Sequence, residues 1–406
     1  MKQLQRLTNI VWQTIIAFAV LIFTIALSGP VRAITGFSLG YSLVVGIFVV
    51  VLAVKIYYQR SNRQLELDLS TTIFFLLTFI FLFQRLYYSA FHGLVSVGGG
   101  DAGVHANYQR LFVQESSDVY QSFVGFLSAS YWPQYLFGAT TFESFRLVFY
   151  EVVFLTVLCI GLLGRATIRD YITSKQQAPI FFAVLIIIGF LPAERIIAPI
   201  LHYLQADGFY PQLVGLPPLL FIWFLYARVA SFYSRVFLLL WGMVLLRYCY
   251  GLHLPDAILA SSLVLALEAF EAKDPKDHRT ALIVLSSLFF ALALLGYKRL
   301  LQIFEMDGAI VRTNLVMIVV GQALLSGLLL TSATGGFVQI ESPVVKRLLR
   351  FAACFGIAGL FLDICYLQSP NYYPYKHAIY PAVVSTIGIC LLSALILVTK
   401  SKLVFS

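Results

Sequence analysis

Residues 378–399 read AIYPAVVSTIGICLLSALILVT, and this stretch contains no charged side chain. It is long enough to cross the hydrocarbon core of a bilayer as a helix, which needs about 20 mainly apolar residues. Similar stretches occur near residues 9–28, 37–57, 70–90, 146–164, 179–200, 211–227, 235–250, 254–270, 280–297, 313–332 and 350–366. The sequence therefore predicts an all-α fold, a polytopic transmembrane helical bundle with about 12 transmembrane helices.

The composition of the whole chain agrees with this prediction. Of the 406 residues, 60% are hydrophobic, 15% are aromatic and 12% are charged, and the mean hydropathy is +0.87. Such a composition excludes an ordinary water-soluble domain. The apolar runs are also much longer than the strands of a membrane barrel, which alternate over about 10 residues. The first run follows Lys2 and Arg6 like a signal peptide, but its length and the sequence of residues 30–33 favour a membrane span.

The distribution of basic residues predicts the orientation. When both termini are placed in the cytoplasm, most of the 28 Lys and Arg residues fall on the cytoplasmic side, as the positive-inside rule requires. Topology thus explains the net charge of +9, and we expect no nucleic-acid partner. Lys298 and Arg299 are the main exception, because they fall outside. We expect a multi-pass protein of the plasma membrane.

The domain organisation is predicted to be simple. Residues 1–406 form one transmembrane domain, in which residues 1–60 are an N-terminal helical hairpin and residues 91–145 are an extracytoplasmic loop between the third and fourth spans. The second half of this loop, residues 119–137, is too polar to span and too aromatic to be free in water. It predicts an interfacial helix on the outer leaflet, with Tyr131, Trp132 and Tyr135 at headgroup depth.

Polar residues gather at the predicted outer face. They are His92, His105, His202, His253, His377, Asp101, Asp207 and Asp256. Because such groups cost several kcal/mol near the hydrocarbon unless they are paired or hydrated, they indicate a water-filled outer cavity. The alternative is that these loop residues are simply solvated.

The outer loop carries the first of three notable clusters. Gly98, Gly99 and Gly100 allow a sharp turn, and Asp101 and His105 follow at a spacing of four. Asp101 is placed either to cap a helix that begins after it or to act as a base beside His105.

Two further clusters lie at short outer turns. One contains Arg195, His202 and Asp207, and an arginine near the outer third of a span needs an anionic partner such as a phosphate. The other contains Arg247, His253 and Asp256. Here the alternative is ordinary capping, since Asp256 falls in the first turn of a helix.

The outer loop Gly99-Gly100-Asp101-Ala102-Gly103-Val104-His105, followed by an interfacial segment and paired helices with short outer turns, resembles the GT-C membrane glycosyltransferases. The resemblance implies a GT-C-like fold and an enzyme that moves a sugar from a polyprenyl-phosphate donor to an acceptor on the extracytoplasmic side. The acceptor would be a glycan, a lipid or a protein, and the enzyme a hexosyl- or pentosyltransferase. By position, Asp101 matches the family's base for the acceptor hydroxyl.

This function assigns roles to the polar residues. Cations at the outer rim would stabilise the charge on the departing phosphate. The expected catalytic residues are Asp101 and His105; those that bind the donor phosphate are Arg195, Arg247, Lys298 and Arg299; those that bind substrate are His202, Asp207, His253, Asp256, Tyr373 and His377. Many members carry a second acidic residue where this chain has His105, which leaves open whether a divalent cation, Mg²⁺ or Mn²⁺, is bound.

Two other functions are compatible with the sequence. A polymerase or ligase of lipid-linked oligosaccharides also acts outside, although its large outer loop is expected late in the chain. A multi-pass transporter or flippase would have a similar number of helices, but the sequence shows no internal repeat.

Overall fold

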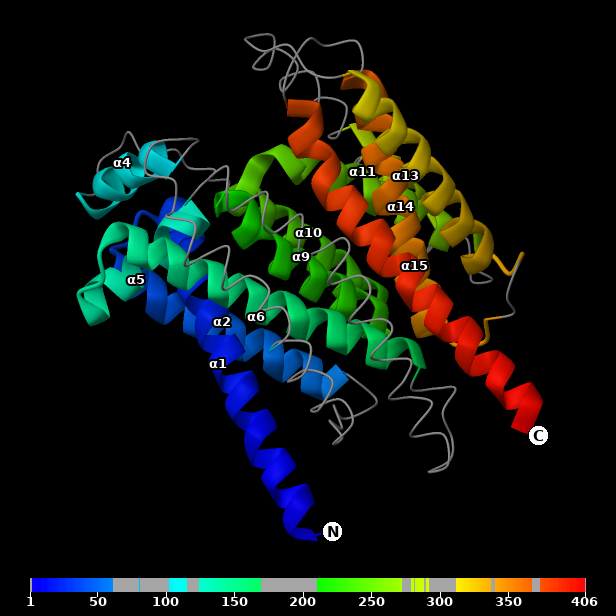
Figure 1. Cartoon of the computed structure of the whole chain (residues 1–406), viewed down its shortest axis with the longest axis horizontal. Helices are drawn as coiled ribbons and strands as arrows, with labels where there is room; N and C mark the ends of the chain where they lie inside the picture. The colour runs from blue at the N-terminus through cyan, green and yellow to red at the C-terminus, as the bar shows by residue number, and fades with distance from the viewer. Residues whose placement is uncertain are drawn as a thin grey trace. The chain divides into compact units, whose positions relative to one another are not determined.

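The computed structural model describes residues 2–60, 80, 102–114, 124–168, 210–271, 279–280, 282–287, 290–291, 312–336, 340–366 and 373–405. Within these ranges the regular structure is entirely helical, with eleven α-helices and one 3₁₀ turn (Figure 1). The chain divides into two compact units. Unit 1 comprises Met1–Arg165 and Thr173–Gly251, and unit 2 comprises Ala166–Ile172 and Leu252–Ser406.

Nine of the apolar stretches expected to span the membrane coincide with helices. These are α1 (Lys2–Thr35), α2 (Leu39–Arg60), α6 (Thr141–Ile168), α9 (Tyr210–Arg228), α10 (Phe232–Tyr250), α11 (Leu254–Glu271), α13 (Arg312–Ala333), α14 (Pro343–Tyr366) and α15 (Tyr373–Phe405). The stretches near 70–90, 179–200 and 280–297 lie wholly or mostly outside the described residues.

Four segments of the described chain are long and apolar enough to cross a membrane: Gln13–Thr35, Thr141–Thr167, Phe232–Phe270 and Ala378–Thr399. They indicate an integral, multi-pass membrane protein. Two shorter apolar helical segments are Leu39–Leu52 and Val320–Ala333. The described residues therefore support fewer spans than the twelve that the sequence predicts.

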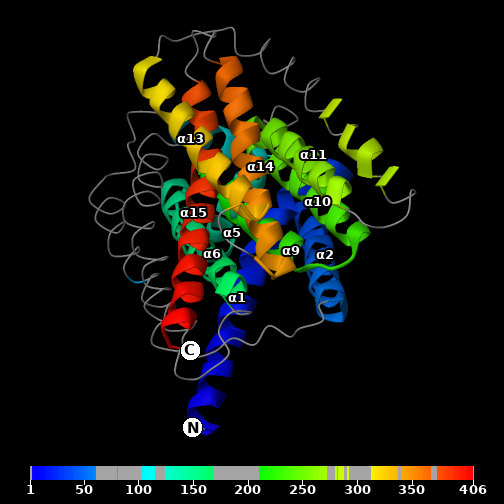
Figure 2. The same ribbon diagram turned by 90° about the vertical axis from the view of Figure 1, so that its right-hand side faces the viewer.

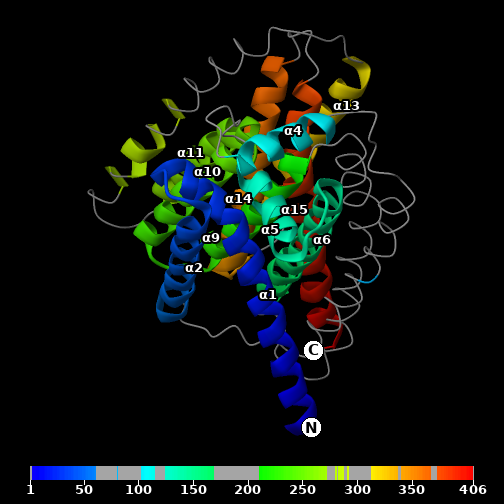
Figure 3. The same cartoon turned by 90° about the vertical axis from the view of Figure 1, so that its left-hand side faces the viewer.

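In unit 1, α1 and α2 pack side by side (Figure 3). Gly36 ends α1 with a φ of 72°, and its N–H donates to the Arg32 carbonyl at 2.8 Å. This left-handed conformation is the usual glycine stop signal of a helix. Two shorter helices follow in the chain, α4 (Ala102–Val113) and α5 (Val124–Phe137).

Helix α5 packs against α1, α4, α9 and α10. It approaches α1 closely at Gly29, where an added Cβ would lie 2.1 Å from the carbonyl oxygen of Val124. Around this contact Trp132 Nε1 donates to Ser28 Oγ at 3.2 Å, and the Ser28 and Ser128 hydroxyls bond to each other. Small residues thus bring two backbones together while polar groups hold them.

The burial of α5 differs from the expected interfacial helix. Residues Val124–Ser130, Trp132 and Pro133 are buried in the protein, and Tyr131 is half-buried, whereas Tyr135 is 68% exposed. The sequence predicted Trp132 at headgroup depth; its depth in the membrane stays a prediction, but its side chain is buried in the protein and does not lie open to lipid. Its indole is instead drawn against α1, because Gly29 leaves room for α5 and Ser28 accepts its N–H.

In unit 2, α13, α14 and α15 pack on one another, and α11 packs on α14 (Figure 2). The contact again uses small residues of α14. An added Cβ at Gly356 would lie 2.1 Å from Ser326 Oγ and 2.4 Å from Ser385 Oγ. The Gln322 amide donates to the Gly356 carbonyl at 2.9 Å, so polar groups on α13 and α15 face the small-residue surface of α14.

Candidate functional site

Helix α4, in the loop predicted to lie outside the membrane, packs against its neighbours in unit 1. Helix α4 begins at Ala102, the residue after Asp101. His105, only 3% exposed, lies with its ring edge-on to Phe126 of α5, with centroids 5.5 Å apart. One turn further along, the buried Gln109 accepts a hydrogen bond from Ser130 of α5 at 2.7 Å. These contacts fix one face of α4 on α5.

The other end of α4 is held by α1. The Arg32 guanidinium donates to the Phe112 carbonyl at 3.2 Å and lies 4.8 Å from the centroid of the Phe112 ring. A basic side chain at a helix C-terminus satisfies a carbonyl that has no partner within the helix. Helix α4 is therefore held by neighbouring helices at two points, through Gln109 and Phe112.

Several of the predicted site residues lie outside the described part of the chain, and the structure does not test them. These are Asp101, Arg195, His202, Asp207, Lys298 and Arg299. The spacing argument that paired Asp101 with His105 stays a prediction.

In unit 2 the structure brings together two of the predicted substrate-binding residues. The 3₁₀ turn Gly251–His253 leads into α11, with Pro255 and Asp256 in its first turn. His253 Nδ1 lies 3.1 Å from Asp256 Oδ2, and both side chains are fully buried. The local geometry follows from the sequence, since a residue in the first turn of a helix can reach back to the residue before it.

A third side chain completes this cluster. The ring of Tyr380, on α15, stacks on the imidazole of His253 with centroids 3.8 Å apart and an interplanar angle of 8°. Tyr380 is also fully buried. Asp256 thus fixes the edge of the imidazole and Tyr380 fixes its face, so the ring has one defined orientation.

The other predicted residues are placed only in part. Arg247 is exposed in the last turn of α10, with its guanidinium carbon 5.9 Å from the centroid of the Tyr248 ring. Tyr373 and His377 lie in the first turns of α15. They precede Tyr380 by seven and three residues, and 3.6 residues per turn put the three positions on one face of the helix.

The His253–Asp256 pair has a definite chemical capability. When Nδ1–H donates to the carboxylate, the neutral imidazole keeps Nε2 as an acceptor, which is the arrangement of a carboxylate-oriented general base. The same buried hydrogen bond also links the 3₁₀ turn to the first turn of α11. No group of three or more His, Cys, Asp or Glu side chains suited to a metal occurs among the described residues, so the divalent-cation hypothesis still depends on residues outside them.

Two residues of these sites were not anticipated. Arg32 holds α4, and Tyr380 stacks on His253. Arg32 had a signal in the sequence, because a basic residue at the outer end of the first span departs from the positive-inside pattern. Tyr380 had a weaker signal in the sequence, which is its spacing of three residues from His377 on a helix.

Comparison with known proteins gives no match to a family model, a curated protein or a solved structure.

Proposed function

We propose that the protein is a membrane glycosyltransferase that moves a sugar from a polyprenyl-phosphate donor to an acceptor on the extracytoplasmic side. The observation that supports the proposal is the anchored helix α4, whose first described residue, Ala102, follows Asp101 in the glycine-rich sequence. A catalytic group is most effective when its supporting element is rigid, and His105, Gln109 and Arg32 provide that support.

In the proposed reaction, the Asp101 carboxylate accepts the proton of the acceptor hydroxyl. The hydroxyl oxygen bonds to the anomeric carbon as the bond from that carbon to the phosphate oxygen breaks, and polyprenyl phosphate leaves. The leaving phosphate gains negative charge, which Arg195, Lys298, Arg299 and Arg247 are proposed to stabilise. His105 is buried on α4, so we assign it the role of a positioning residue.

The remaining predicted residues are proposed to bind the sugar and the acceptor. His253, oriented by Asp256 and Tyr380, offers a fixed imidazole, and Tyr373 and His377 occupy positions on the same face of α15 as Tyr380. Together with His202 and Asp207 they form the proposed substrate-binding set. The full complement of twelve spans belongs to the same proposal, with both termini in the cytoplasm and the reaction at the outer face.

The test uses purified wild type and Asp101→Asn in detergent. Transfer or hydrolysis is measured with a panel of radiolabelled polyprenyl-phosphate sugars, and donor binding is measured in parallel. We expect Asp101→Asn to bind the donor but to lose about 100-fold or more in turnover, which is the usual contribution of a general base.

Asn107→Ala is the matched control, because Asn107 is an exposed residue of α4 that accepts a hydrogen bond from Arg110 on the helix surface. It should keep wild-type turnover. Equal turnover by Asp101→Asn and wild type would refute the role of Asp101. A wild type that neither binds nor converts any donor would refute the function and favour a transporter or an assembly subunit.

A further inference from the structure

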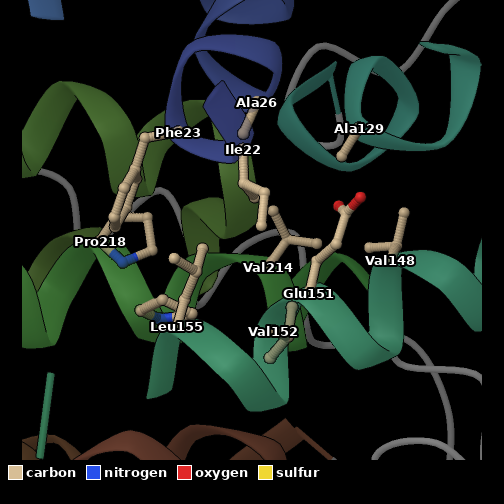
Figure 4. A pocket seen from close by; sticks show the side chains of 11 residues that line it. Ile22, Phe23, Ala26, Ala129, Val148, Glu151, Val152, Leu155, Val214 and Pro218 are labelled. Atoms are coloured by element: carbon tan, nitrogen blue, oxygen red, sulfur yellow. The ribbon is translucent and has the colours of Figure 1, made fainter. Parts of the chain in front are cut away.

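Unit 1 has a small, partly open cavity between α1, α5, α6 and α9 (Figure 4). Its volume is about 20 Å³, which is room for about one water molecule. The walls are Ile, Phe, Ala, Val, Leu and Pro side chains, with a single exception on α6, Glu151. Figure 4 shows the Glu151 carboxyl directed into the space between α5 and α9.

Glu151 lies well inside the candidate span Thr141–Thr167. None of the other described residues that line the cavity carries a charge, a titratable group or a hydroxyl, whether it comes from α1, α5, α6 or α9. An ionised carboxylate in such surroundings costs several kcal/mol unless it is paired or hydrated. An ionised Glu151 would therefore need a cation or water beside it, and no other side chain of the described lining carries a positive charge.

Helix α9, which forms part of the cavity wall, has an unusual backbone acceptor. Val214 lines the cavity, and the residues three and four positions after it on α9 are Pro217 and Pro218. A helical carbonyl normally accepts from the N–H at one of these two positions, and proline has no N–H. The Val214 carbonyl thus lacks both of its usual donors within the helix.

We propose that Glu151 is a proton-binding site inside the membrane unit. The bound proton makes the side chain a neutral acid, and its O–H donates to the backbone acceptor that the two prolines leave on α9, directly or through the one water that the cavity can hold. Glu151 is half-buried, so protonation removes the cost of a charge among apolar side chains, and it also supplies the missing donor. The site is independent of the proposed glycosyl transfer and involves none of its residues.

Infrared difference spectroscopy of the full-length protein in detergent tests this proposal. A protonated carboxyl has a carbonyl band that is distinct from the two bands of a carboxylate. We expect the acid band at neutral pH in wild type, its absence in Glu151→Gln, and its retention in the control Glu341→Gln, which changes an exposed carboxyl. The band should be lost as the pH rises, because the proton leaves.

Pro218→Ala tests the acceptor. The substitution restores an N–H that donates to the Val214 carbonyl. The protonated form of Glu151 then loses this hydrogen-bond acceptor and is less stabilised relative to the carboxylate. A hydrogen bond of ordinary strength predicts that the pH at which half of the acid band remains falls by about 0.5–1 unit. An unchanged midpoint would overturn the role of α9.

Carbodiimide treatment of wild type identifies the acid without any variant. The reagent adds to a protonated carboxyl: the proton moves to one nitrogen, the carboxyl oxygen bonds to the central carbon, and nothing leaves, so mass spectrometry locates the adduct. Carboxylate bands from Glu151 in wild type at neutral pH would overturn the proposal. Loss of the acid band on adding sodium at constant pH would also overturn it, because a metal ion would then occupy the site.

Discussion

Replacing Gly29 by alanine tests how closely α1 and α5 must approach. The new Cβ would lie 2.1 Å from the Val124 carbonyl oxygen and 2.8 Å from the Ser128 Cβ, where ordinary contacts begin at 3.4 Å. The helices would have to separate by roughly 1 Å. The bond from Trp132 Nε1 to Ser28 Oγ, now 3.2 Å, and the bond between Ser28 and Ser128 would then break.

The expected cost follows from these contacts. Overpacking a tight interface costs about 1–3 kcal/mol, and each interhelical hydrogen bond in a membrane protein contributes about 0.6 kcal/mol. We therefore expect Gly29→Ala to lower the free energy of unfolding by about 2–4 kcal/mol relative to Gly321→Ala. Gly321 is the matched control, because it is inside α13 and an added Cβ meets no atom within 4 Å.

The assay is reversible unfolding in mixed micelles with increasing dodecyl sulfate. Tryptophan fluorescence follows the transition, and Trp132, buried beside Ser28, reports on the α1–α5 contact itself. Equal unfolding midpoints for Gly29→Ala and Gly321→Ala would show that α1 and α5 do not need their close approach, and the packing argument would fail.

Two further substitutions test local features. Glu143 accepts from the N–H of Thr140 at 2.7 Å and from its hydroxyl at 2.8 Å at the start of α6, so Glu143→Ala should lower the unfolding midpoint slightly in the same assay; an unchanged midpoint would argue against this cap. Tyr380→Ala should cost about 3 kcal/mol, since it removes a buried ring from the face of His253, whereas Tyr380→Phe keeps the stack and should cost less. Equal losses in the two Tyr380 variants would contradict the importance of the ring contact.

The sequence predicts the helices well because apolar length alone identifies them. Residues 378–399 contain no charge, and they form most of α15. The pairing of His253 with Asp256 could also be predicted from the sequence, because the two residues are only three positions apart. Local spacing decides such contacts.

Contacts between helices could not be predicted from the sequence. Tyr380 lies far along the chain from His253, and its stacking depends on how α15 packs in unit 2. Tryptophan is common at membrane interfaces, but Trp132 is buried because Gly29 has no side chain and lets α5 approach α1. A single sequence does not reveal which glycine lies at a contact between helices. It also does not reveal the cavity at Glu151, because four helices form it together.

The α1–α5 contact has a consequence for biosynthesis. Ser28 and Ser128 are 100 residues apart in the chain, and a ribosome adds about 5–20 residues each second. Helix α1 therefore enters the membrane about 5–20 s before α5 exists, with the hydroxyl of Ser28 and the bare backbone at Gly29 facing lipid or the insertion machinery. Until α5 is made, the Ser28 hydroxyl keeps only its bond to the Ile25 carbonyl within α1, at 2.7 Å, so the contact between the two helices forms late in synthesis.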